Sequence, residues 1–180
     1  MVGRRLAPVA AALALIAALA APAGARVDRA KSAPLVANAA LATQMVSDVN
    51  RLRRSHGLRQ LRISTKLSAA AAQHTQEMAR LGYFSHVSAD GSVFWRRVQR
   101  YYPSRGRAFW AVGENLLWAS PDVDAARSLK MWMASPEHRA NLLKGDWREI
   151  GLAVVHVPSA PGVFNGAEVT IVTADFGVRR

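Results

Sequence analysis

The chain has 180 residues, no cysteine and a formal net charge of +12. Without cysteine it cannot contain a disulfide framework or a thiolate metal site, so any metal ion would need histidine, carboxylate or water as ligands. The charge favours anionic partners such as phosphate-bearing polymers, acidic lipid surfaces or nucleic acid, while a solvated, arginine-rich surface would give the same composition.

Residues 1–25 have the three parts of a secretory signal peptide. Arg4 and Arg5 precede an apolar run over residues 9–21, and the small residue Ala25 comes before a polar segment. The run is shorter than the roughly 20 residues that a membrane-spanning helix needs. We therefore expect cleavage after Ala25, secretion to the extracellular space or periplasm, and no transmembrane span in the mature chain.

The mature chain is long enough for one domain. Residues 26–38 contain Ala, Pro, Ser and charges without periodicity, which predicts a linker, and residues 39–180 are assigned to the domain. For a secreted protein of this charge, a lipid or an anionic cell-envelope component is a more accessible partner than nucleic acid. The sequence does not define an oligomeric state.

Three helices are predicted in the first half of the domain. Apolar residues recur at helical spacing from Leu41 to Leu52. A second helix begins after Ser64 and ends at Gly82, and its His74 is more often a packed residue than a ligand. A third helix follows from Phe94. Its spacing favours aromatic residues in the core and arginines in water over an alternative in which both bind nucleic acid by stacking on the bases.

Two polar signals follow in the middle of the chain. Glu114 stands immediately before an apolar run that can enter a sheet or core, so its carboxylate must be solvated, paired or bound. Ser120 and Pro121 predict a helix start, as the cap and the first helical residue. That helix extends to Trp132.

The last third of the chain predicts a short helix and two strands. Ser135 caps a helix that starts at Pro136 and ends near Gly145, and this helix would hold His138 on a rigid element. Residues 150–157 and 169–176 are rich in β-branched residues and predict two strands. Helices first and strands late favour an α+β fold.

Three segments together resemble one protein family, and they occur in the family's order. They are Phe84-Ser85-His86 with Asp90-Gly91 after it, Gly113-Glu114-Asn115-Leu116, and Trp132 to Gly151. These motifs are similar to those of the CAP superfamily, also called the SCP domain, of cysteine-rich secretory, antigen 5 and plant pathogenesis-related proteins. The resemblance covers about residues 42 to 178.

The resemblance implies a three-layer α-β-α sandwich with a mainly antiparallel central sheet. It also implies a cleft lined by two histidines and acidic residues. By motif position, His86 matches the first cleft histidine, Glu114 the first glutamate and His138 the second histidine. Ser135 stands where several relatives carry a second glutamate, so the implied set lacks one member.

His86, Glu114 and His138 are the expected metal ligands. Two imidazoles and a carboxylate can hold a divalent ion such as Zn²⁺ and leave a position open for water. The expectation depends on the resemblance, because the spacing of the three residues along the chain does not itself indicate a metal site. We expect no organic cofactor.

Three functions remain open from the sequence, one of which is a charge-driven binder of nucleic acid or another anionic polymer whose affinity falls steeply with salt. The other two concern the cleft. The first is a secreted protein that binds a divalent metal and a lipid or envelope ligand at the cleft, without a defined catalytic reaction. The alternative is a hydrolase, a peptidase or esterase, using His86, Glu114 and His138, with Glu114 and Ser135 as candidate catalytic residues. A capping Ser135 would direct its oxygen to a backbone N–H and no nucleophile elbow presents it, so we favour binding over catalysis.

Overall fold

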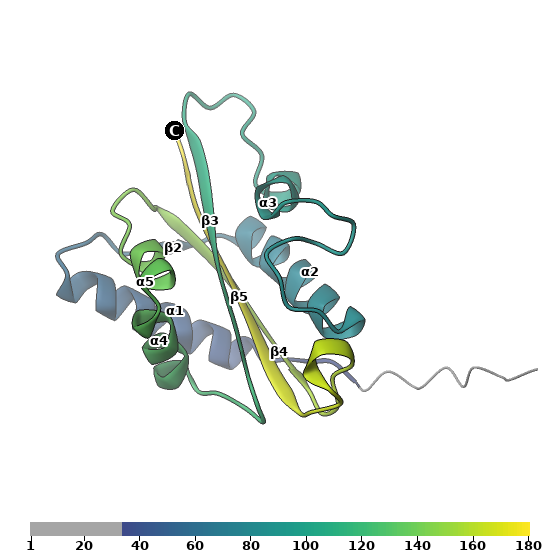
Figure 1. The fold of residues 1–180 in the computed structure, drawn as a ribbon. Helices are drawn as coiled ribbons and strands as arrows, with labels where there is room; N and C mark the ends of the chain where they lie inside the picture. The colour runs from purple at the N-terminus through teal and green to yellow at the C-terminus, as the bar shows by residue number, and fades with distance from the viewer. Residues whose placement is uncertain (1–33) are drawn as a thin grey trace, which may run out of the picture. The chain divides into compact units, whose positions relative to one another are not determined.

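The computed structural model describes residues 34–180. The predicted signal peptide and residues 26–33 of the predicted linker lie outside the described residues. The described part is a three-layer α-β-α sandwich, with a sheet between two layers of helices (Figure 1). The predicted fold class is confirmed.

The sheet of the described part has five strands, and four of them follow the order β1-β4-β5-β3 with antiparallel neighbours. β2 pairs with β4 in parallel. The strands are β1 (Val36–Ala37), β2 (Arg62–Ile63), β3 (Trp110–Ala119), β4 (Glu149–Val157) and β5 (Val169–Arg179). β3 is therefore an edge strand, and β1 lies within the range assigned to the linker.

Helices cover both faces of the sheet. Figure 1 shows α1, α4 and α5 on one side and α2 and α3 on the other. Their bounds are α1 (Ala39–Ser55), α2 (Thr65–Leu81), α3 (Phe94–Tyr101), α4 (Ala125–Ala134) and α5 (Pro136–Leu142), with a 3-10 turn, η1, at Gly162–Phe164. Among the described residues, none of these helices is both long and apolar enough to span a membrane.

β5 is the centre of the core, and every one of its residues except Arg179 is buried. Because strand side chains alternate between the two faces, Val172 and Phe176 pack in the cluster under α1 and α4. Val169 and Ile171 pack in the cluster that includes Met78 of α2. The strand predicted over residues 169–176 is confirmed and extends to Arg179.

Local signals explain the ends of α2. The Ser64 side chain accepts a hydrogen bond from the backbone N–H of Leu67 at 3.4 Å. At the other end, Gly82 has the left-handed conformation, with φ of 70°. Both predicted boundaries are confirmed.

The start of α4 differs from the prediction. The helix begins at Ala125 and its cap is Asp124, whose carboxylate accepts from the N–H of Arg127 at 2.7 Å. Ser120 and Pro121 instead follow β3 as part of the connection. The Asp124 carboxylate offers the first-turn N–H groups a charged acceptor, which explains why the helix starts there.

The cap of α5 also differs in detail. Ser135 is the N-cap residue, but its side chain makes no capping hydrogen bond. Its backbone carbonyl accepts from the N–H of Arg139 at 2.9 Å. The helix ends at Leu142, before the predicted stop at Gly145.

Candidate functional site

Glu114 lies on β3 with its side chain almost fully buried, and both carboxylate oxygens have partners. Oε1 is 2.8 Å from Nδ1 of His86. Oε2 accepts a hydrogen bond from Nη2 of Arg97 in a buried ion pair. The sequence predicted that this carboxylate is solvated, paired or bound, and in the structure it is paired.

Arg97 of α3 connects Glu114 to the loop that carries His86. Its Nη1 donates to the hydroxyl of Ser88 at 3.0 Å and to the backbone carbonyl of His86 at 3.4 Å. The side chain is only 1% exposed. Sequence reasoning missed this residue, although its spacing from Phe94 places it next to the apolar face of the helix.

His74 holds the same loop from α2. Its Nε2 is 2.8 Å from the backbone carbonyl of Ser85, and because a carbonyl only accepts, this nitrogen carries the proton. The imidazole is fully buried, and burial followed by the charge of Arg97 lowers its pKa. His74 is a packed residue, as expected, and it also positions the residue before His86.

Asp175 of β5 is the cross-strand neighbour of Glu114. Its side chain is fully buried, and within the described residues neither of its oxygens has a hydrogen-bond partner. Burial and then the adjacent negative charge of Glu114 raise the pKa of Asp175, which favours its protonated form. The sequence indicated only a strand at this position.

His138 comes from the other helical layer. Asn115, next to Glu114 on β3, donates from Nδ2 to the backbone carbonyl of His138 at 3.1 Å. Asn141 donates in turn to Oδ1 of Asn115 at 2.9 Å, and this amide pair fixes α5 against the edge strand. The imidazole itself is partly exposed.

His86 acts electrostatically on His138. Burial lowers the pKa of His138, and repulsion by His86 lowers it further, against the opposing effect of Glu137. His86 comes from the loop between α2 and α3, and His138 comes from α5. The structure thus brings His86 from one helical layer and His138 from the other to adjacent residues of β3, Glu114 and Asn115.

The donor set for a metal is smaller than the predicted trio. Within residues 34–180, no group of three or more histidine, aspartate or glutamate residues is arranged to hold an ion. Glu114 would have to leave His86 or Arg97 to become a direct ligand. An ion at this site would therefore need Nε2 of His86 and the ring of His138 as its ligands, while Glu114 would stay on Nδ1 of His86.

Ser135 does not form the hydrogen bond expected of a serine nucleophile. In the part of the chain that the structure describes, its hydroxyl donates to neither His86 nor His138. Its assignment as a candidate catalytic residue stays a prediction.

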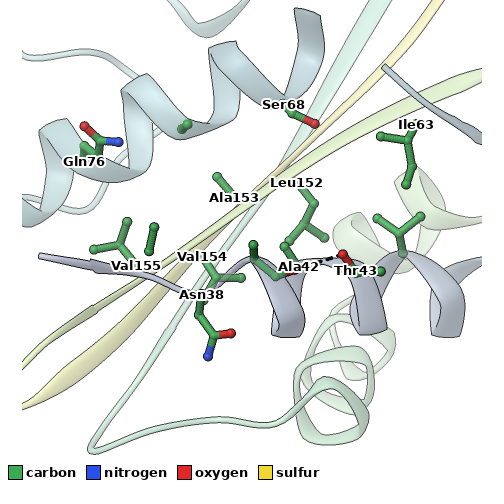
Figure 2. Close-up of a pocket in the computed structure, with 14 residues that line it drawn as sticks. Asn38, Ala42, Thr43, Ile63, Ser68, Gln76, Leu152, Ala153, Val154 and Val155 are labelled. Atoms are coloured by element: carbon green, nitrogen blue, oxygen red, sulfur yellow. Dashed lines mark hydrogen bonds between the residues drawn. The ribbon is translucent and has the colours of Figure 1, made fainter. Parts of the chain in front are cut away.

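An apolar cavity lies apart from the histidines, between α1, α2 and β4 (Figure 2). Its volume is about 300 Å³. Figure 2 shows Leu152 and Val154 of β4 facing this space, with Thr43 of α1 and Ser68 of α2 nearby. None of its lining residues is titratable, and the cavity shares no residue with the site of His86, Glu114 and His138.

The chain matches one protein family over most of its length. The sequence model of the cysteine-rich secretory protein family, CAP, matches residues 46–176.

Two Bacillus subtilis proteins are similar in sequence. The uncharacterized membrane protein YlbC is 29% identical over 111 residues, which are 62% of this chain and 30% of that protein. The uncharacterized protein YkwD is 32% identical over 113 residues, which are 62% of this chain and 41% of that protein. The match therefore spans less than half of either relative.

Solved structures have the same fold. An outer surface protein of Borrelia burgdorferi aligns with a TM-score of 0.64 at 19% identity, over 82% of this chain and 99% of that one. An extracellular protein with an SCP domain from Bacillus anthracis aligns with a TM-score of 0.60 at 26% identity, over 78% of this chain and 41% of that one. The first likeness concerns the fold alone.

Proposed function

The chain belongs to the CAP family of cysteine-rich secretory proteins, and from this premise we propose that it is an exported binding domain in which His86 and His138 hold a divalent ion such as Zn²⁺. Imidazole nitrogen is a preferred Zn²⁺ ligand, and water or a bound molecule completes the coordination. A bound ion would supply positive charge that polarises an oxygen of that molecule.

The hydrogen bond from His86 to Glu114 carries this proposal. A carboxylate on one imidazole nitrogen fixes the ring and its tautomer and directs the other nitrogen outward, as in many metal sites. Glu114 contacts Nδ1 at 2.8 Å, which leaves Nε2 for a ligand, and the His86 side chain is 50% exposed. The lowered pKa of His138 favours the neutral imidazole that binds metals.

Calorimetric titration of the mature protein with Zn²⁺ tests the site. We expect one binding event that is lost in His86→Ala and in His138→Ala and is weakened about 10 to 100-fold in Glu114→Gln. His56→Ala, at the exposed end of α1, is the matched control and should bind like the parent protein. Absence of binding in the intact protein, or its survival in the His86 and His138 variants, would refute the proposal.

The proposed location is outside the cytoplasm, and the proposed partner is a lipid or an anionic envelope component. The three-part leader at residues 1–25, the charge of +12 and the extracellular relative from Bacillus anthracis support it. N-terminal sequencing of the exported protein should begin at Arg26. Recovery of the unprocessed chain in the cytoplasm alone would contradict secretion.

The alternative function, a peptidase or esterase, rests on the same pair of side chains. An imidazole oriented by a carboxylate is the arrangement of a general base. If the site is hydrolytic, turnover of a peptide or ester panel should disappear in His86→Ala and persist in Ser135→Ala, because within the described residues the Ser135 hydroxyl forms no hydrogen bond with either histidine. Absence of turnover across the panel leaves the binding function.

A further inference from the structure

We propose that a second pocket, between α3 and the loop that follows it, binds the phosphate group of a phosphate ester. The pocket has a volume of about 380 Å³ and is lined by Arg96, Gln99, Arg100, Pro103, Ser104 and Arg105. Three of these side chains are guanidinium cations and two more carry hydrogen-bond donors, whereas none is acidic. This site shares no residue with the His86 and His138 pair and does not depend on metal binding there.

The arginines of α3 lie on two different faces of the helix, one at the pocket and one in the core. Arg96, Gln99 and Arg100 follow the i, i+3, i+4 spacing that places side chains on one face of a helix. Arg97 lies between them in sequence but points into the core, where it pairs with Glu114. α3 therefore uses one arginine to hold the His86 loop and presents two to the pocket.

The loop after α3 is held in place to complete the pocket. Gln99 donates from Nε2 to the hydroxyl oxygen of Ser104 at 3.0 Å, which connects the helix to the loop. The N–H of Arg107 bonds to the carbonyl of Ser104 at 3.1 Å and closes a turn that contains Arg105. Because Ser104 accepts from Gln99, its own hydroxyl hydrogen can be donated to a ligand.

The positive charge of the pocket is only weakly compensated. Among the described residues, Arg96 and Arg105 take part in no ion pair. Arg100 has one acidic neighbour, with Nη2 at 3.5 Å from Oδ2 of Asp90, and both side chains are more than half exposed. Such a pair contributes little in water, so a phosphate can replace the carboxylate beside Arg100.

The chemistry favours phosphate among anions. A guanidinium group donates two parallel hydrogen bonds to a phosphate and binds it more strongly than a neutral donor does. A phosphate monoester also presents three acceptor oxygens and nearly two negative charges, whereas a carboxylate presents two oxygens and one charge. The volume of the pocket also leaves room for the alcohol part of a phosphate ester. Such a phosphate ester occurs both in soluble or polymeric esters and in phospholipid headgroups.

Titration of the mature protein with sn-glycerol 3-phosphate at low ionic strength tests the pocket. We expect the triple variant Arg96→Gln, Arg100→Gln, Arg105→Gln to bind on the order of tenfold more weakly or worse. The control triple variant Arg54→Gln, Arg59→Gln, Arg62→Gln removes the same charge from exposed positions elsewhere and should retain the parent affinity. Circular dichroism confirms that both variants fold.

A flotation assay with phosphatidylcholine vesicles, with and without phosphatidylglycerol, identifies the source of the phosphate. Binding of glycerol 3-phosphate alone assigns a soluble or polymeric ester. Flotation that needs phosphatidylglycerol and is lost in the pocket variant assigns a lipid headgroup. The proposal fails if neither probe binds the intact protein, or if both triple variants reduce binding equally.

Asp90→Asn gives a test in the opposite direction. The amide retains an oxygen for the hydrogen bond from the Ser92 N–H, which is 2.9 Å long, and removes the charge that competes at Arg100. Affinity for glycerol 3-phosphate should rise several-fold. Unchanged or weaker binding would contradict a phosphate position at Arg100.

Discussion

Arg97 is the residue on which the candidate site depends most. It neutralises the buried carboxylate of Glu114 and bonds to Ser88 in the His86 loop. Removing one partner of a buried ion pair leaves an uncompensated charge, so Arg97→Met should lower the free energy of unfolding by roughly 3 to 5 kcal/mol. Arg96→Met, one residue earlier on the exposed face, should change it by no more than about 0.5 kcal/mol.

Urea unfolding of both variants measures this difference, and the Zn²⁺ titration should weaken together with stability in Arg97→Met. Similar losses in the two variants would mean that the guanidinium of Arg97 is not the counter-ion of Glu114.

His74 should make the stability of the protein depend on pH. Its pKa is lowered in the folded state from the ordinary 6.5, first by burial and then by Arg97. The unfolded chain therefore takes up the proton more readily, so the contribution of His74 is complete above about pH 6.5 and is lost as the pH falls below it. His74→Gln can still donate to the Ser85 carbonyl.

Unfolding midpoints in urea between about pH 7.5 and 5 test this linkage. The parent protein should lose more stability on acidification than His74→Gln does. Parallel profiles for the two proteins would exclude His74 as a source of the pH dependence.

At the scale of elements, the packing of α2 on β4 depends on Gly151. A Cβ at this position would lie 2.0 Å from the backbone nitrogen of Ser68 and 2.1 Å from the carbonyl carbon of Leu67. Because backbone atoms cannot move aside as a flexible side chain does, Gly151→Ala should cost about 3 kcal/mol or more and displace α2. The matched change Gly145→Ala meets its nearest neighbour at 3.8 Å and should have little effect.

Thermal unfolding of the two alanine variants provides the comparison. A Gly151→Ala protein as stable as Gly145→Ala would show that the helix and strand can separate without cost.

Local sequence signals predicted the elements better than the contacts of the site. α2 has a cap and a glycine stop within its own sequence, so Ser64 and Gly82 gave its ends correctly. The start of α4 was wrong because Ser120 and Asp124 both fit a cap, and only the folded chain decides between them. The capping preferences of Ser and Asp are too similar to decide which of two residues, four positions apart, begins the helix.

The residues of the candidate site were likewise predicted only in part. His86, Glu114 and His138 came from a family resemblance. The structure brings His86 and Glu114 into contact and bonds the backbone of His138 to Asn115, the residue after Glu114. Arg97 and Asp175 were missed, because an arginine on a helix and an aspartate in a strand acquire their roles only when β3, β5 and α3 assemble. Ser135 remains a catalytic candidate from sequence alone.

For the domain as a whole, the site joins the two helical layers. The Glu114 side chain faces the layer of α2 and α3, where it contacts His86. The Asn115 side chain faces the opposite layer and donates a hydrogen bond to the backbone of His138 on α5. Adjacent residues of β3 thus contact opposite layers, as the alternation of a strand requires. The separation of the two imidazoles is therefore set by the packing of both layers on one sheet.

The shared sheet predicts that the two layers unfold together. Ile171 lies in the α2 cluster, whereas Trp132 and Trp147 lie in the other cluster. Ile171→Ala should cost about 2 to 5 kcal/mol and Ile171→Val about 0.5 to 1.5 kcal/mol. The other three tryptophans lie outside that cluster, so each protein, parent included, also carries Trp95→Phe, Trp110→Phe and Trp118→Phe. Because β5 supplies side chains to both clusters, the signal of Trp132 and Trp147 in near-ultraviolet circular dichroism and the backbone signal in the far ultraviolet should shift to the same lower temperature in each variant. A tryptophan transition that stayed at the parent temperature while the backbone signal moved would show that the layers are independent.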